Sequence, residues 1–189
     1  MEDWVQRALA RWPNVPALYG WLGLDRRGRW LIRGETITRP QIIETIDRNY
    51  AADERGCWYF QNGPQRGYVQ LDVAPFVLRV GDDGERLLTH NGLPVDRPTR
   101  AFIDEEGSLL LATGHGAAAF ADTDLDWVLQ RIGGADDELR DDELASALAL
   151  PSGTSTALTL RCAERRLPLI RLDAADAEAE LGFVRVPAP

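Results

Sequence analysis

The sequence predicts an α+β protein with largely antiparallel sheets. Short apolar or alternating segments are separated by turns rich in Gly, Asp and Pro, which is typical of strands and hairpins. Fewer segments repeat apolar residues at helical spacing. A hairpin-plus-helix pattern over residues 19–50 also returns in weaker form over residues 101–132. An internal duplication explains this return, and a chance match of two common hairpins explains it nearly as well.

The first copy of the pattern opens with a hairpin. Asp25 begins and Gly28 ends a four-residue bend between two apolar runs, which is ordinary β-turn chemistry. If Asp25 faces Gly28, the alternation of side chains along a strand places Trp30 opposite the bare backbone of Gly23. One face of the hairpin is then a tryptophan-rich core face formed by Trp21, Gly23, Trp30 and Ile32.

A helix follows in the first copy. Thr38 and Gln41 have the spacing of a capping box, and Pro40 falls in the first turn, where its missing N–H costs nothing. The helix therefore begins near residue 39. Its predicted apolar stripe consists of Ile42, Ile43, Ile46 and Tyr50.

The second copy repeats these features. Asp104 and Gly107 form the same Asp-x-x-Gly bend, and residues 109–111 stand where residues 30–32 stood. The helix behind them is capped by Thr123 or Asp124 and stops at a pair of glycines, residues 133 and 134. Its apolar stripe consists of Leu125, Val128, Leu129 and Ile132.

We expect two lobes. An N-terminal α+β lobe covers residues 1–80 and starts with a short amphipathic helix over residues 2–12. A C-terminal α+β lobe covers residues 81–189 and contains an acidic helical segment over residues 135–150. The further predicted strands are residues 57–61, 68–73, 76–80, 86–90, 156–162, 167–172 and 178–186.

Composition excludes several classes of function. The net charge of −9 and the pI near 4.7 argue against nucleic acid or an anionic membrane as a partner. All 21 basic residues are arginine, so there is no Schiff-base lysine and no phosphate-loop lysine. Cys57 and Cys162 are predicted to be buried free thiols. Neither a secretory signal nor a membrane-spanning run is present, so we expect a cytoplasmic location.

A spaced set of residues in the first part of the chain is distinctive: Trp30, Gly34, Ile37, Arg39, Gly56, Tyr59, Val69, Ala74, Pro75 and Phe76. In these residues the chain resembles a bacterial family known only as a domain of unknown function. The resemblance covers roughly residues 19–132 and implies a two-part α+β fold with a duplicated motif. Its second half is superficially like an open pleckstrin-homology barrel, and signal transduction is the role it implies. The chain departs from the family at Val73, because the expected acidic residue stands one position earlier, at Asp72.

A cluster of aromatic and polar side chains over residues 58–68 is the predicted binding site. Apolar walls with a few amide and guanidinium donors are typical of sites for small ligands and peptides. Taken singly, each residue is better explained as buried aromatic core or solvated turn. We expect a non-enzymatic cytoplasmic binding or signalling module, with an unknown small molecule or protein partner held between the lobes. The predicted site residues are Trp58, Tyr59, Asn62, Gln65, Arg66 and His90.

Two other functions stay open. A hydrolase-type enzyme would use His115 with a nearby carboxylate, although a histidine between two glycines is more often a flexible loop. A structural subunit would form a homodimer through a sheet edge or the N-terminal helix. We assign no catalytic residue, no metal ligand and no cofactor, because the sequence has no nucleophile motif, metal-ligand spacing or phosphate loop.

Overall fold

The computed structural model describes residues 3, 7, 10–11, 15–134, 139–162 and 164–189. The chain forms two compact units, one of Met1–Pro75 with Phe183–Pro189 and one of Phe76–Gly182. The predicted helix over residues 2–12 lies mostly outside the described residues. None of the described helices is both long enough and apolar enough to cross a membrane.

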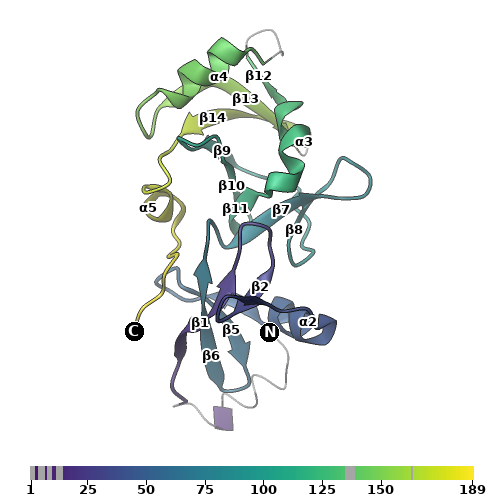
Figure 1. Ribbon diagram of the computed structural model, residues 1–189, viewed down its shortest axis with the longest axis vertical. Coiled ribbons are helices and arrows are strands. Elements are labelled where there is room, and N and C mark those ends of the chain that lie inside the picture. Colours follow the sequence, from purple (N-terminus) through teal and green to yellow (C-terminus); the bar gives the residue numbers. More distant parts are fainter. Residues whose placement is uncertain (1–2, 4–6, 8–9, 12–14, 135–138, 163) are drawn as a thin grey trace. The chain divides into compact units, whose positions relative to one another are not determined.

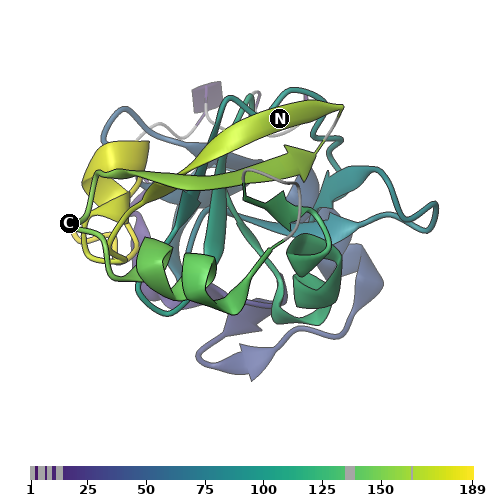
Figure 2. The same ribbon diagram turned by 90° about the horizontal axis from the view of Figure 1, so that it is seen from above.

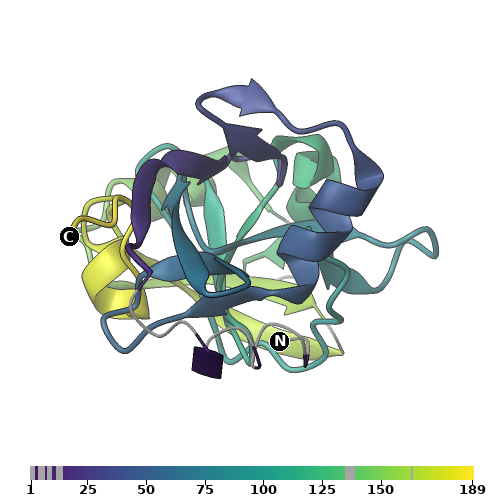
Figure 3. The ribbon, with the colours of Figure 1, turned by 90° about the horizontal axis from the view of Figure 1, so that it is seen from below.

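The first unit is a six-stranded sheet with helix α2 beside it (Figures 1 and 3). The strand order is β3-β2-β1-β6-β5-β4, and all neighbouring strands are antiparallel except β1 and β6. In this unit, Ile46 of the helix is buried, and a second buried cluster of Cys57, Tyr59 and Tyr68 belongs to strands β5 and β6 and the residue before β5. Its elements are β1 (Leu18–Leu24), β2 (Trp30–Ile32), β3 (Glu35–Thr36), α2 (Pro40–Arg48), β4 (Tyr50–Ala52), β5 (Trp58–Asn62) and β6 (Gln65–Leu71).

The second unit is an eight-stranded sheet curled into a half-barrel, in the order β12-β13-β14-β9-β10-β11-β7-β8. Its parallel pairs are β14 with β9 and β11 with β7, and helix α4 contacts β13 (Figure 2). Its strands are β7 (Phe76–Val80), β8 (Leu87–Thr89), β9 (Arg100–Ile103), β10 (Leu109–Thr113), β11 (Gly116–Phe120), β12 (Ile132–Gly133), β13 (Ser155–Cys162) and β14 (Arg165–Arg171). Its helices are η1 (Asp122–Asp124), α3 (Leu125–Leu129), α4 (Asp141–Leu148) and α5 (Ala177–Leu181).

Both units contain the same six-stranded arrangement. From β1 to β6 and from β9 to β14, the chain makes a three-stranded meander, a helix, a short strand and a hairpin. In each unit the last strand of the hairpin returns parallel to the first strand of the meander. The predicted repetition is therefore confirmed, and it extends over residues 18–71 and 100–171. The second unit adds β7 and β8 at one edge and α4 between β12 and β13.

The strand register agrees between the repeats as closely as the topology. Leu24 pairs with Leu71 across the parallel strands of the first repeat, and Ile103 pairs with Arg171 in the second. The residue after each parallel strand then donates its N–H to the carbonyl of Leu24 or Ile103, at 3.0 Å in both cases. Equivalent positions of the last strand, such as Leu71 and Arg171, are therefore 100 residues apart.

Each repeat begins with the same aspartate turn. The Oδ1 atom of buried Asp25 accepts two main-chain N–H groups at 2.9 and 2.8 Å, and Oδ1 of buried Asp104 accepts two at the same distances. Gly28 and Gly107 follow at φ angles of 71° and 85°, in the left-handed region that glycine enters without a Cβ clash. The predicted Asp-x-x-Gly bends are present in both copies.

The predicted register of the first hairpin is wrong by one residue. The N–H of Asp25 closes a three-residue loop that ends in the left-handed glycine, so Trp30 lies opposite Leu24 rather than Gly23. A slip of one residue exchanges the two faces of a strand. Trp30 is consequently buried beside Leu24, whereas Trp21, which was predicted for the same core face, is exposed.

The N-terminal ends of helices α2 and α3 are not capped as predicted. Arg39, rather than Thr38, is the N-cap residue of α2, with the extended backbone that a following proline imposes. Pro40 therefore fixes the first helical residue, and no side chain caps this end. Asp124 is the N-cap residue of α3 as predicted, but its carboxylate accepts the N–H of Val80 on β7, at 3.1 Å, instead of capping the helix.

The last predicted strand, over residues 178–186, is wrong in its first half. Helix α5 occupies that part because alanine and glutamate favour helix, and Gly182 ends it at a φ angle of 70°. The second half belongs to the first unit, where Val184 forms an isolated parallel bridge with Cys57. Cys57 and Cys162 are buried free thiols, as predicted.

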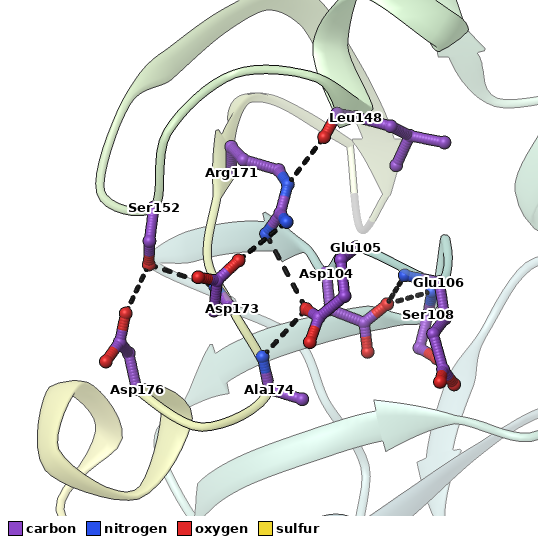
Figure 4. A network of polar contacts seen from close by, with 10 residues as sticks. All are labelled: Asp104, Glu105, Glu106, Ser108, Leu148, Ser152, Arg171, Asp173, Ala174 and Asp176. Atoms are coloured by element: carbon purple, nitrogen blue, oxygen red, sulfur yellow. Dashed lines mark hydrogen bonds and ion pairs between the residues drawn. The ribbon is translucent and has the colours of Figure 1, made fainter.

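The repeats differ where each parallel strand ends. Their register makes Leu71 and Val73 of the first repeat equivalent to Arg171 and Asp173 of the second. The side chain of Arg171 is only 4% exposed. It donates Nη2–H to Asp173 at 2.6 Å and Nε–H to the carbonyl of Leu148, the last residue of α4, at 3.1 Å (Figure 4). An apolar pair in one repeat is thus an ion pair in the other.

Arg171 ties three segments together. Its Nη1 lies 3.8 Å from the carboxylate of Glu105 in the second aspartate turn, and Nη1 donates no hydrogen bond within the described part of the chain. The Ser152 hydroxyl donates to Asp176 at 2.5 Å and accepts the N–H of Asp173 at 3.0 Å (Figure 4). A buried guanidinium is costly unless it is paired. The network therefore holds the end of α4 and the loop after β14 against the turn.

A double-mutant cycle tests this exchange of an apolar pair for an ion pair. Asp173→Val should lower the free energy of unfolding by about 2–3 kcal/mol, because it leaves Arg171 buried without its nearest carboxylate. Arg171→Leu with Asp173→Val recreates the pair of the first repeat and should return stability to within about 1 kcal/mol of wild type. Urea unfolding of the two single variants and the double variant measures the coupling. A double variant as unstable as the sum of the singles would contradict the equivalence of the two positions.

Candidate functional site

An apolar groove of about 270 Å³ opens on the first unit, between α2 and strands β1, β2, β5 and β6. Three large apolar side chains that remain exposed line it, since Trp21 is 47%, Ile32 44% and Ile42 39% exposed. Exposed apolar residues that gather on one depression are typical of an interaction site. The other lining residues are Leu18, Leu22, Ile46, Phe60, Asn62, Gln65 and Gly67.

The amphipathic helix α2 supplies one wall. Ile42 and Ile46 are one turn apart and so face the same side of the helix. Ile46 is buried, whereas Ile42 reaches the open part of the groove. The helix is held by Asp47, which accepts the indole N–H of Trp30 at 2.7 Å, and the ring of Tyr50 packs edge-on to Trp30 with centroids 5.0 Å apart. This wall is therefore fixed by the core of the unit.

Trp21 on β1 supplies another wall. The guanidinium of Arg33 lies 3.9 Å above the centre of its ring, and the N–H of Arg33 donates to the carbonyl of Trp21 at 2.8 Å. Stacking of this kind holds the plane of an exposed indole. Arg33 adopts a φ of 51°, an uncommon backbone angle for a residue with a side chain. The indole is thus a preformed apolar surface.

Two predicted site residues, Asn62 and Gln65, bring side-chain amides to the groove. They pair at the end of the β5–β6 hairpin, which buried Gln61 braces by donating to the carbonyls of Gly63 and Gln65 at 3.0 and 3.3 Å. The Gln65 amide donates to the carbonyl of Pro16 at 3.3 Å. The Asn62 amide forms no hydrogen bond with any residue that the structure describes. An amide offers both a donor and acceptor, so one polar ligand group of either kind can be satisfied there.

Three other predicted residues lie away from the groove. Trp58 is buried beside Tyr50, with ring centroids 4.8 Å apart. Tyr59 is buried on the opposite face of the sheet, as strand alternation requires. Arg66 stacks over the Tyr59 ring at 4.4 Å and donates to the side-chain oxygen of Gln61 at 3.1 Å. The polar-aromatic cluster of the sequence is therefore divided between two faces.

The aromatic face on the other side of the sheet is organised by Asp53. Tyr19 stacks on Tyr68 with centroids 4.6 Å apart, and the Tyr68 hydroxyl donates to Asp53 at 3.0 Å. Burial and this bond raise the pKa of Tyr68. Burial alone would raise the pKa of Asp53, but hydrogen bonds from Cys57, Tyr68 and Arg55 outweigh it and lower that pKa. Because two of these donors are main-chain N–H groups of a tight turn, Asp53 repeats the structural role of Asp25.

The sixth predicted residue, His90, belongs to the second unit. Its Nδ1 accepts the N–H of Val77 at 3.3 Å, which places the proton of the neutral ring on Nε2. Burial, helped by the nearby charge of Arg79, lowers the pKa of His90 to about 3. The imidazole is therefore uncharged near neutral pH and does not offer a cation to a ligand.

His115 is placed in an exposed turn. Its Nε2 lies 2.9 Å from the carbonyl of Pro94, and its main-chain N–H donates to the hydroxyl of Thr113 at 3.1 Å. A carbonyl oxygen can only accept, so Nε2 carries the proton in this contact. No carboxylate among the described residues is hydrogen-bonded to His115, although Asp96 lines the same depression of about 390 Å³.

The groove residues Trp21, Ile32 and Ile42 were assigned by the sequence pattern to the core. Trp21 was misplaced by the one-residue slip of the hairpin. Ile32 lies on the same face as Trp30, as predicted, but at the end of β2 it remains 44% exposed. Ile42 was misplaced because the whole helical stripe was treated as buried. The neighbouring isoleucines 42 and 43 were the available signal, since adjacent residues on a helix differ by about 100° and cannot both face one narrow core.

Comparison with known proteins identifies relatives of unknown function. A family model described as "Protein of unknown function (DUF2946)" matches residues 1–188, which confirms the resemblance to an uncharacterised family. A DUF1285 family protein from Silicibacter pomeroyi DSS-3 has a similar crystal structure, with a TM-score of 0.53 and 18% identity over 83% of this chain and 84% of that chain. A duf1285 family protein from Shewanella baltica OS155 gives a TM-score of 0.37 and 11% identity over 55% and 85%. No curated protein matched. The Silicibacter likeness shows a shared α+β fold and confirms the predicted fold class.

The buried histidine predicts an acid-sensitive fold. Because the folded-state pKa of His90 lies below the unfolded value near 6.5, its contribution to stability is complete above that value and is lost as pH falls toward 3. Between pH 7.5 and pH 5 wild type should lose roughly 2 kcal/mol through this group. Urea unfolding of wild type and His90→Asn across that range isolates the effect, since His115 and the carboxylates are common to both. If the free energy of unfolding changed equally with pH in wild type and in His90→Asn, His90 would be accessible to protons in the folded state.

Proposed function

We propose that this chain, which belongs to the family described as Protein of unknown function (DUF2946), is a non-enzymatic binding module. Its first unit binds a small, largely apolar molecule in the groove beside α2. The observation that carries the proposal is the convergence of Trp21, Ile32 and Ile42 on one preformed depression. Removing such surface from water contributes about 25 cal/mol per Å² of apolar area, which is the main source of affinity for a ligand of this kind.

The size and polarity of the groove support a compact ligand. Its volume of about 270 Å³ is slightly below the range of about 300–1,000 Å³ that is typical of drug-sized ligands. A peptide helix, about 10–12 Å across with its side chains, does not fit such a volume. Asn62 and Gln65 supply one polar corner. The ligand is therefore mostly apolar, with one hydrogen-bonding group that meets the Asn62 amide.

The chemistry of the groove supports binding rather than catalysis. The polar side chains among its described lining residues are amides, which do not exchange protons near neutral pH. General acid–base catalysis needs a titratable group within hydrogen-bond reach of the substrate. The groove can hold and orient a molecule, and none of its described side chains would transform it.

A ligand titration observed by NMR tests this site. We choose 1-naphthol as the probe because it combines two fused apolar rings with one hydroxyl. The indole signal of Trp21 and the side-chain amide signals of Asn62 should shift saturably, whereas the indole signal of Trp127 in the second unit should not. Ile42→Glu places a charge in the groove and should weaken binding at least tenfold, equivalent to about 1.4 kcal/mol.

Leu129→Glu is the matched control. Leu129 is 45% exposed on helix α3, so the same charge is introduced at an exposed leucine of the other unit. It should leave the affinity for 1-naphthol unchanged. Shifts that do not saturate, or that are weakened equally by both substitutions, would mean that the groove is not a ligand site.

A further inference from the structure

The apolar groove of the first unit has an arginine beside its apolar wall. Arg33 follows Ile32 directly, in the turn between β2 and β3, and its guanidinium lies 3.9 Å above the centre of the Trp21 ring. Trp21 and Ile32 both line the groove. A molecule that packs on these two side chains therefore has a positive charge as its neighbour. The polar corner formed by Asn62 and Gln65 belongs to a different pair of strands.

The backbone fixes where this arginine stands. Ile32 pairs with Glu35 across a two-residue turn, and Arg33 and Gly34 have φ angles of 51° and 83°. Positive φ at both central residues is the pattern of a type I′ turn, which matches the twist of the strands that it joins. The N–H of Arg33 also donates to the carbonyl of Trp21 at 2.8 Å. The side chain thus starts from a backbone that two neighbouring strands hold.

Stacking on Trp21 leaves the hydrogen-bonding groups of Arg33 available. A guanidinium stacks through its flat face, whereas its five N–H groups lie in its plane. Arg33 is exposed, and its side chain forms no hydrogen bond or ion pair with any residue that the structure describes. The indole therefore holds a cation in place without neutralising it.

Helix α2 adds positive potential at the wall that it supplies. Arg39 is its N-cap residue and precedes Ile42 by one turn, and the Arg39 side chain has no acidic partner within the described part of the chain. The first turn of the helix carries no acidic residue, and no side chain caps its N-terminal end. The positive end of the helix dipole is thus left uncompensated.

Most carboxylates on the same elements are already engaged. Glu44 forms an ion pair with Arg48 on α2, at 3.7 Å, and Asp47 accepts an indole N–H at 2.7 Å. Glu35 stands on the edge strand β3 and forms no ion pair with Arg33. An anion that reached Arg33 would therefore compete with no existing acidic partner.

We propose that the ligand of this groove is an apolar carboxylic acid, whose carboxylate pairs with Arg33 while its apolar body packs on Trp21 and Ile42. This inference rests on the binding function proposed above and names the class of ligand. A carboxylate matches the fork of a guanidinium through two parallel hydrogen bonds. A doubly charged phosphate is less suitable, because Glu35 stands two residues from the one stacked arginine.

Calorimetric titration with two matched probes at pH 7.5 tests this class. 1-Naphthol and 5-hydroxy-1-naphthoate share the fused rings and the hydroxyl, and they differ by one carboxylate, which is ionised at this pH. Wild type should bind the carboxylate roughly threefold to fivefold more tightly at low salt, which is the size expected of an exposed ion pair. The advantage should disappear at about 1 M NaCl, where salt screens exposed charges over about 3 Å.

Arg33→Gln should remove the advantage at low salt as well, so that the two probes bind with equal affinity. The readout is the ratio of two affinities within one variant. Loosening of the Trp21 wall weakens both probes and leaves this ratio unchanged. Loss of the ion pair changes the ratio itself, which separates recognition of the carboxylate from support of the indole.

Arg26→Gln is the matched control, since it removes an exposed arginine from the tip of the β1–β2 hairpin in the same unit. It should keep the full advantage. If 1-naphthol binds saturably and the carboxylate binds no more tightly, or if Arg33→Gln keeps the advantage, this inference is wrong and the proposed function stands. If neither probe binds saturably, the inference and the proposed function both fail.

Discussion

The hydrogen bonds that main-chain N–H groups donate to the Asp25 and Asp104 carboxylates are the constraint on which each repeat depends. They fix a three-residue loop, and the loop length fixes the register of the meander. Because neighbouring residues of a strand point to opposite faces, this register decides which side chains are core and which are surface. Trp30 enters the core and Trp21 becomes a wall of the groove for this reason.

The fold class, the repetition and most strands were predictable from the sequence, because alternation and turn residues are local signals. The strand β7 and the Asp-x-x-Gly bends are examples. Register was not predictable, since two loops that differ by one residue fit the same Asp and Gly. The groove depended on that register. Asn62 and Gln65, predicted as site residues from the composition of residues 58–68, do line the groove, whereas placing Trp21 there required the register to be known.

The duplication also shows how one architecture carries unlike side chains at equivalent positions. The ends of the β5–β6 and β13–β14 hairpins have the same pairing, but their side chains differ. Asn62 and Gln65 present amides at one hairpin end, where Cys162 and Arg165 present a thiol and a charge at the other. Chemistry can change in this way without a change of topology, because exposed positions at a hairpin end contribute little to the core.

All basic residues of this chain are arginine, and they serve two purposes. Burial and the available partners decide which purpose each one serves. Arg171 is buried, forms an ion pair with Asp173 and donates to the end of α4, so its charge is compensated within the fold. Arg161 is exposed and donates to a main-chain carbonyl, so its charge persists at the surface. The same residue type is therefore a buried structural cation at one end of the sheet and a solvated cation at the other, and the partners available at each place decide which.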